Sequence, residues 1–106
     1  SVRVMAEEYL EGPEFSCDFL VEGDRVALLR FTRKLPLPGA PLGVTRAYVP
    51  ADCLGGPVPA IEKVAAAMAT GAQALGLDRT ICMADFILCD DEIMQGLEVT
   101  VCHTWR

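Results

Sequence analysis

The alternation of apolar and polar residues predicts a hairpin near the start of the chain. The runs EFSCDFLV (14–21) and RVALLRFT (25–32) are rich in residues that strands favour, and the tripeptide EGD separates them. Gly23 gives this tripeptide the conformational freedom that a tight turn needs. We expect a loop rich in Pro and Gly at 36–43 and a short strand, TRAYVPA, at 45–51 to follow.

One helix is expected over 59–75, where apolar residues recur at helical spacing. Pro59 suits its first turn and Gly76 its C-terminal stop. The positions expected to face the core are Ile61, Val64, Ala65, Met68, Ala72 and Leu75. Small residues occupy the other side, so we expect this helix to pack against a sheet.

Two further runs, TICMADFIL (80–88) and IMQGLEVTV (93–101), predict a second hairpin around the acidic turn CDDE. The order of elements is several strands, one helix and then a hairpin, without regular alternation of strand and helix. It predicts an α+β fold with a mainly antiparallel sheet and one principal packed helix. With 106 residues, of which 52% are hydrophobic, we expect a single domain over 1–106.

The charge balance argues against a nucleic-acid partner. The net charge is -6 and the pI is near 4.6, whereas nucleic-acid affinity comes mainly from clustered Lys and Arg. No apolar run approaches the ~20 residues of a membrane span, and the start SVRVMAEEYL lacks the apolar region of a secretory signal. We therefore expect no membrane partner.

The five cysteines indicate a reducing compartment. They are odd in number and scattered, and no C-x-x-C pair occurs, which fits neither a disulfide framework nor a structural zinc site. We expect reduced, mostly buried thiols in a cytoplasmic protein.

Two carboxylates in the second hairpin are candidate metal ligands. If the connecting loop has two or four residues and is centred between Asp91 and Glu92, Asp85 lies opposite Glu98. Opposed residues on one face of a hairpin have Cβ atoms roughly 4.5 to 5.5 Å apart, so the two acids must share either a proton or a cation. Magnesium would suit such a pair. The alternative is a different register, or a face on which both acids are solvated.

Five short motifs, taken in order, resemble the second subdomain of the ATP-grasp ligases. That subdomain typically runs from a hinge reading EE(Y/F)(L/I)xGxE, through a basic residue and a helix, to strands reading (D/E)F and LEVN. The corresponding stretches here are EEYLEGPE (7–14), FTRKL (31–35), ALGL (74–77), ADFIL (84–88) and LEVT (97–100). The resemblance covers nearly the whole chain, and it implies ATP and Mg²⁺ as cofactors.

The resemblance gives the acidic hinge a role in nucleotide binding. It implies that Glu7 accepts a hydrogen bond from the adenine amino group and that Glu14 holds the ribose hydroxyls. Backbone groups near Glu8, Tyr9 and Leu10 would meet the edge of the base. Without the resemblance, these glutamates would be interpreted as a solvated edge of the hairpin.

The resemblance also assigns the phosphate and metal ligands. Lys34 matches the basic residue that reaches the nucleotide phosphates, and its neighbour Arg33 points to the opposite face by strand parity. Asp85 and Glu98 match the two acidic metal ligands. Thr100 stands where the family usually has a metal-binding asparagine, and a hydroxyl is a poorer ligand than an amide oxygen. The arginine that the family has two residues later is replaced by Cys102.

The implied chemistry is ATP-dependent ligation through an acylphosphate. A small carboxylate substrate attacks the γ-phosphate, and an amine or a thiol then displaces phosphate, while Lys34 meets the charge that develops. The glycine-rich lid and the domain that binds the acid are absent from these residues, so we expect a half-cleft that is inactive alone. The alternative is a non-catalytic α+β module with a degenerate nucleotide site, whose apolar surfaces serve packing or dimerisation.

Overall fold

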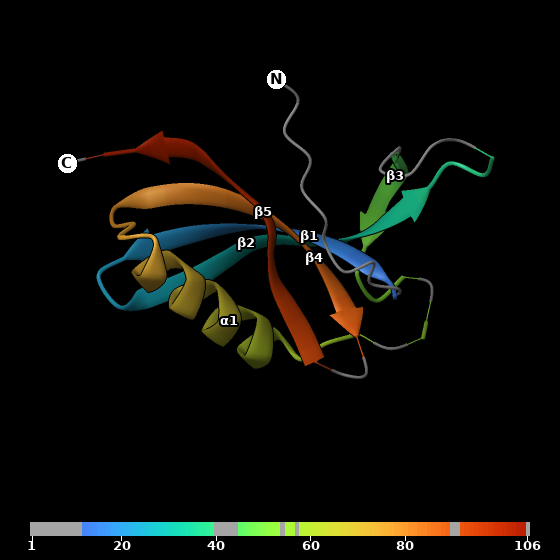
Figure 1. Ribbon diagram of the computed structural model, residues 1–106, viewed down its shortest axis with the longest axis horizontal. Coiled ribbons are helices and arrows are strands. Elements are labelled where there is room, and N and C mark those ends of the chain that lie inside the picture. Colours follow the sequence, from blue (N-terminus) through green and yellow to red (C-terminus); the bar gives the residue numbers. More distant parts are fainter. Residues whose placement is uncertain (1–11, 40–44, 54, 57, 90–91, 106) are drawn as a thin grey trace, which may run out of the picture.

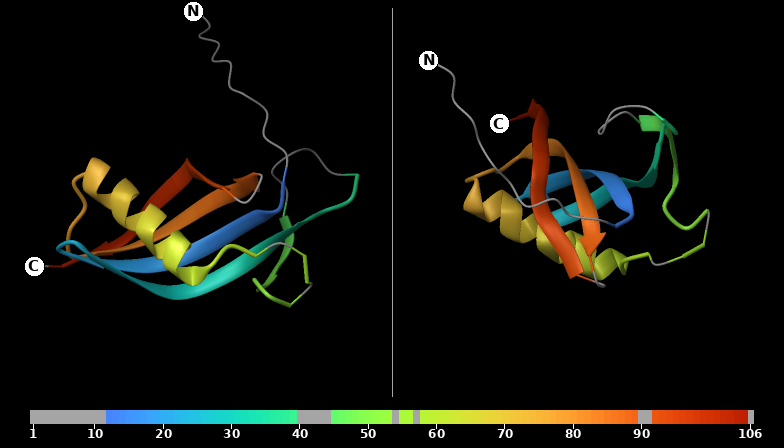
Figure 2. Two further views of the ribbon diagram at one scale, coloured as in Figure 1. Left: turned by 90° about the horizontal axis from the view of Figure 1, so that it is seen from below. Right: turned by 45° about the vertical axis from the view of Figure 1, so that its right-hand side comes forward.

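Five antiparallel strands form one sheet, and a helix packs on one of its faces (Figures 1 and 2). The computed structural model describes residues 12–39, 45–53, 55–56, 58–89 and 92–105, with the backbone alone for 45–46, 92–100 and 103. The spatial order of the strands is β3-β2-β1-β4-β5. The elements are β1 (Glu14–Glu22), β2 (Arg25–Pro36), β3 (Thr45–Pro50), α1 (Ile61–Ala74), β4 (Thr80–Cys89) and β5 (Glu92–Thr104). The predicted α+β class is confirmed, as are both hairpins.

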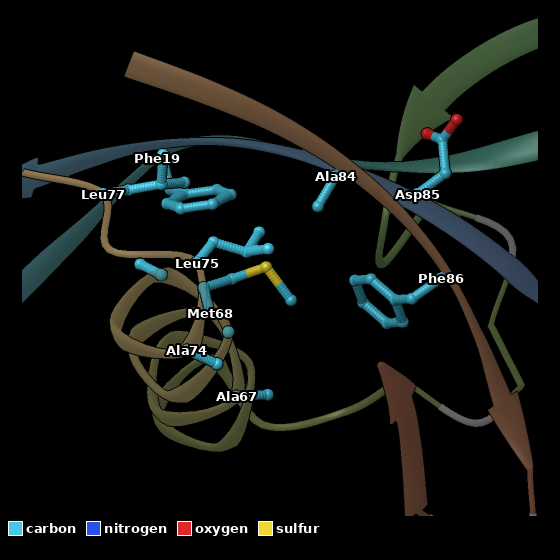
Figure 3. A pocket seen from close by; sticks show the side chains of 11 residues that line it. Phe19, Ala67, Met68, Ala74, Leu75, Leu77, Ala84, Asp85 and Phe86 are labelled. Atoms are coloured by element: carbon cyan, nitrogen blue, oxygen red, sulfur yellow. The ribbon is translucent and has the colours of Figure 1, made fainter. Parts of the chain in front are cut away.

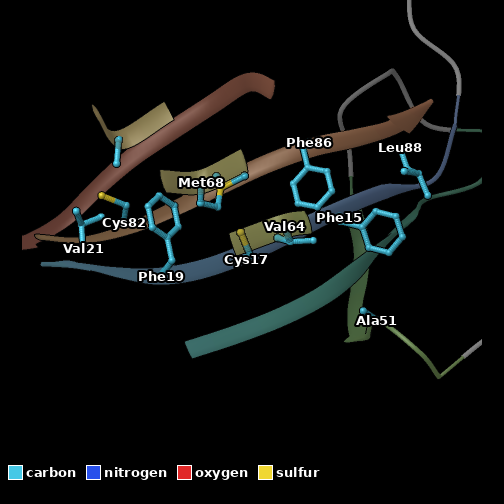
Figure 4. Close-up of a cluster of buried hydrophobic side chains, with 12 residues drawn as sticks. Phe15, Cys17, Phe19, Val21, Ala51, Val64, Met68, Cys82, Phe86 and Leu88 are labelled. Carbon is cyan, nitrogen blue, oxygen red and sulfur yellow. The ribbon is translucent and has the colours of Figure 1, made fainter. Parts of the chain in front are cut away.

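The core lies between α1 and the neighbouring strands β1 and β4 (Figure 4). The aromatic ring of Phe15 anchors it, with ring centroids 5.4 Å from Phe31 and 5.6 Å from Phe86. Such distances lie within the range in which aromatic pairs attract each other. The other buried apolar side chains of the cluster are Cys17, Phe19, Val21, Ala51, Val64, Met68, Ala72, Cys82, Ala84 and Leu88.

The helix buries the middle of its predicted apolar face but not the two ends. Val64, Met68 and Ala72 are buried, whereas Ile61 and Leu75 are each 61% exposed. Ile61 is the first residue of α1 and Leu75 follows its last, so both lie at the ends of the packed stripe. Gly76 ends the helix as predicted, with a φ of 68°. Within the described ranges, no helix is long and apolar enough to cross a membrane.

The register between β4 and β5 is the predicted one from Cys82 to Asp85, although the turn lies elsewhere. Asp85 pairs with Glu98 and Met83 with Thr100, as expected. The turn, however, is closed by the pair Cys89 and Glu92, one residue earlier than the centre we inferred. Between the paired positions 85↔98 and 87↔94, β4 supplies one residue, 86, and β5 supplies three, 95–97. This irregularity restores the predicted register, and β5 bends along its length (Figure 1).

Gly12 joins the acidic motif to the sheet through a close backbone approach. Its φ is +156°, and a Cβ added there would overlap the carbonyl oxygen of Leu88. The next residue, Pro13, accepts a hydrogen bond of 3.0 Å from the Leu88 amide. The glycine of the motif therefore lets β1 begin directly beside β4.

We expect Gly12→Ala to lower the free energy of unfolding by about 2 kcal/mol or more, because the new methyl group meets backbone that cannot easily move. Urea denaturation measures this change. Gly71→Ala is the matched control, since an added Cβ there meets nothing within 4 Å. In mid-helix it should stabilise the chain by roughly 1 kcal/mol. Equal stability of the Gly12 variant and the wild type would contradict the close approach.

Candidate functional site

The sheet face opposite α1 carries a cluster of polar side chains. Since Phe15, Cys17 and Phe19 point into the core, strand alternation directs Glu14, Ser16 and Asp18 to the other side. Each of these residues pairs with one residue of β2 and one of β4, so the side chains form rows across the sheet. We call this surface the polar face, and its described members are Glu14, Ser16, Asp18, Arg30, Thr32, Lys34 and Asp85.

Three of the predicted site residues, Lys34, Asp85 and Glu14, lie close together. The Nζ of Lys34 lies 3.4 Å from Oδ2 of Asp85 and 4.0 Å from Oε2 of Glu14. The Lys34 and Asp85 side chains are only 14% and 19% exposed, which shields their interaction from solvent, whereas Glu14 is 45% exposed. Lys34 lies on β2 and Asp85 on β4, so this ion pair spans the intervening strand β1.

Arg33 leaves the polar face, as strand parity predicted. Its Nη1 donates a hydrogen bond of 3.2 Å to the carbonyl oxygen of Gly55, in the segment after β3. The two adjacent cations therefore have different surroundings. Of the two, Lys34 is the one placed beside the acidic side chains.

Within the described part of the chain, two buried side-chain oxygen atoms on the polar face have no hydrogen-bond partner. They are Oδ1 of Asp85 and Oγ of Ser16, and the two residues stand directly opposite each other on β4 and β1. Buried polar atoms in folded proteins nearly always have partners. Both oxygens can accept a hydrogen bond or bind a cation, and no described residue uses that capacity.

This donor set fits a hard divalent cation, although it is incomplete within the described side chains. Carboxylate and hydroxyl oxygens are the ligands that magnesium prefers. The backbone register places Glu98 opposite Asp85, and Thr100 lies two residues further along β5, but the side chains of both fall outside the described residues. Among the side chains described, no group of three Asp, Glu, His or Cys residues could hold a metal. A site here therefore depends on Glu98.

The hinge residues Glu7, Glu8, Tyr9 and Leu10 also lie outside the described residues. The chain that follows them is described from Gly12, and it enters β1 at Glu14. Of the acidic residues in this motif, Glu14 is the one that the structure describes, and it lies on the polar face.

A second ion pair on this face was not predicted from the sequence. Arg30 donates through Nε and Nη2 to the two carboxylate oxygens of Asp18, at 2.8 and 3.1 Å. This hydrogen bonding raises the pKa of the guanidinium, whose carbon also lies 5.7 Å from the ring centre of Tyr48. Strand alternation places Asp18 on the same face as Glu14, and this signal in the sequence could have predicted that Asp18 belongs to the polar face.

An apolar cavity of about 190 Å³ lies on the other face, between α1 and the sheet (Figure 3). Phe19, Met68, Ala84 and Phe86 are among its lining residues. Asp85 also borders it, but its carboxylate points away from the helix. The cavity is therefore separate from the polar face.

The expectation of mostly buried cysteines was wrong. Cys17 and Cys82 are buried, Cys89 is partly buried, and Cys53 and Cys102 are exposed. Cys53 lies in a turn after β3, and Cys102 at a register shift near the end of β5, so neither reaches the core. Burial raises the pKa of Cys17 to about 12, and the nearby carboxylate of Asp18 adds to this effect.

Comparison of the chain with protein-family models, with curated proteins and with solved structures gave no significant match. The case for a function therefore rests on the residues and geometry of the polar face.

We expect the stability of the fold to fall with rising pH because of Cys17. In the unfolded chain this thiol loses its proton near the ordinary value of 9.0, whereas in the fold its pKa is about 12. The stabilisation is thus complete below pH 9 and is lost as the pH rises from the unfolded-state pKa to the folded-state pKa. Between these two values, the free energy of unfolding falls by about 1.4 kcal/mol per pH unit. Urea denaturation between about pH 8 and about pH 10 measures the slope.

Cys17→Ala should reduce that slope, even though the variant is less stable throughout. Cys53→Ala is the control, because the Cys53 side chain is exposed in the fold. An unchanged slope in the Cys17 variant would show that the buried thiol does not set the alkaline limit.

Proposed function

We propose that this chain forms the nucleotide- and magnesium-binding half of a cleft in an ATP-dependent ligase that joins a carboxylate to an amine or a thiol. The observation that carries the proposal is the placing of Glu14, Lys34 and Asp85 side by side on the polar face. These residues come from three neighbouring strands and from three separate ATP-grasp-like motifs. A fortuitous set of motif matches would not need to meet at one place.

The electrostatics of the cluster support binding of a metal–nucleotide complex. Asp85 stands opposite Glu98 in the register, and two facing carboxylates favour a shared cation. Lys34 supplies a flexible positive charge that reaches more than one acidic partner. When bound, magnesium would neutralise charge on the β- and γ-phosphates. Lys34, released from Asp85, would then be available to the phosphate oxygens.

The proposed reaction begins with attack of a substrate carboxylate on the γ-phosphate, which gives an acylphosphate and ADP. The nucleophile then displaces phosphate from the acyl carbon. The contribution of the described residues is to position phosphate and to balance charge. The lid and the pocket for the acid would come from other residues of a longer chain or from a partner. The reduced cysteines and the use of ATP favour the cytoplasm as its compartment.

We expect the 106-residue chain to bind a non-hydrolysable ATP analogue in calorimetric titration, and magnesium to strengthen that binding. Glu98→Ala should remove the magnesium dependence, because Asp85 would lose the carboxylate it faces in the register. Glu22→Ala is the matched control, since Glu22 is exposed at the far end of β1. Magnesium-dependent binding that survives in Glu98→Ala would contradict the proposed metal site.

The Lys34–Asp85 ion pair leads to a second prediction. Removal of the Lys34 charge should change the affinities for Mn²⁺ and for the ATP analogue in opposite directions. Lys34→Met should tighten Mn²⁺ binding to the nucleotide-free chain by about tenfold, because an ammonium group no longer competes for Asp85. The same variant should weaken binding of the ATP analogue by about tenfold or more, since a charged hydrogen-bond donor is lost. Electron paramagnetic resonance of Mn²⁺ and calorimetry measure the two affinities.

Arg33→Met is the control, because it removes the same charge from the neighbouring position, whose side chain bonds to Gly55. If both variants behave alike, the effect comes from net charge and not from the contact with Asp85.

The second candidate function is a non-catalytic module that self-associates. Its support is the exposure of large apolar side chains, including Ile61 and Leu75 at the two ends of α1. Under this alternative, substitution of Glu98 would not change the calorimetric titration with the ATP analogue. The chain would sediment as a dimer.

A further inference from the structure

Ser16 is a polar residue whose burial has no structural compensation. It lies in the central strand, its side chain is fully buried, and its hydroxyl has no hydrogen-bond partner among the residues that the structure describes. A buried hydroxyl without a partner destabilises a fold, whereas alanine would fill nearly the same space without that penalty. The presence of a hydroxyl at this place therefore needs another explanation.

The position of Ser16 points to the cation site. Its row on the polar face runs from Thr32 on β2, through Ser16 on β1, to Asp85 on β4. Asp85 carries the other unpartnered oxygen, Oδ1, and its Oδ2 meets Lys34. The Lys34–Asp85 ion pair spans the strand that holds Ser16, so departure of Lys34 would uncover this part of the row.

The neighbouring hydroxyl behaves differently. Thr32 Oγ1 donates a hydrogen bond of 3.2 Å to the carbonyl oxygen of Ser16, so its polar group is satisfied within the sheet. The two hydroxyls of this row therefore differ in their hydrogen bonding. Thr32 has a partner within the sheet, and Ser16 has none among the described residues.

We propose that Ser16 is a further ligand residue of the cation site, and that its Oγ binds the divalent cation together with Oδ1 of Asp85. This inference rests on the proposed function. Serine and threonine hydroxyls hold magnesium at the phosphate loops of other nucleotide-binding proteins. No described residue satisfies this hydroxyl, and a bound cation would do so.

The test is a pair of measurements on Ser16→Ala that must move in opposite directions. Without metal, the thermal midpoint should rise by about 4 °C or more, because an unsatisfied buried group is removed. In contrast, Mn²⁺ affinity, measured by paramagnetic resonance with the ATP analogue present, should fall about tenfold or more. A purely structural serine would not give this combination.

Two further variants keep the test decisive. Thr32→Val should lower the thermal midpoint, since it removes the hydrogen bond to Ser16, and should leave Mn²⁺ affinity unchanged. Ser16→Cys keeps the size of the side chain but offers sulfur, so it should weaken Mn²⁺ binding and strengthen Cd²⁺ binding relative to wild type.

The outcomes separate the two proposals. If wild-type chain binds no Mn²⁺ with the analogue, the proposed function fails, and this inference fails with it. If wild type binds Mn²⁺ and both Ser16 variants bind it equally well, only the inference is overturned. A lower midpoint in metal-free Ser16→Ala also overturns it, because the hydroxyl would then stabilise the fold itself.

Discussion

The structure depends on the two-sided alternation of its central strand. β1 has β2 on one side and β4 on the other, so each of its side chains must serve one of two faces. One face carries Phe15, Cys17 and Phe19 into the core against α1. The other carries Glu14, Ser16 and Asp18. A slip of one residue would exchange the two sets, which makes the hydrophobic core the element that fixes the position of the polar side chains.

Among the described members of the polar face, each of the three carboxylates lies beside one of two cations. Arg30 holds Asp18 with two hydrogen bonds, a bidentate geometry that fixes the two side chains relative to each other. Lys34 makes longer contacts, at 3.4 and 4.0 Å, with two different carboxylates. A compact ammonium group on a flexible stem can exchange partners more easily than a bidentate guanidinium. The two cations of this face therefore differ in character, one fixed in a bidentate pair and one placed between two carboxylates.

The sequence predicted the fold class and both hairpins because their signals are local. Apolar periodicity marked Val64 and Met68, and strand parity separated Arg33 from Lys34. The two extra residues of β5 had no such signal, since an irregularity of pairing depends on backbone geometry across two strands. Contacts such as Arg30 with Asp18, and the burial of Ser16, depend on register between strands and on neighbouring side chains. The sequence of a single strand determines neither the register between strands nor the neighbouring side chains.

That irregularity in β5 bears on the chemistry of the site. The turn lies one residue earlier than inferred, and regular pairing from it would set Asp85 opposite residue 96, a glycine. The extra residues move Glu98 into register instead. Regular pairing would be the simpler arrangement for a purely structural hairpin, and it would avoid placing two acids opposite each other. The ladder thus departs from regularity where it brings two acidic residues into register, and Lys34 supplies positive charge to Asp85 from two strands away.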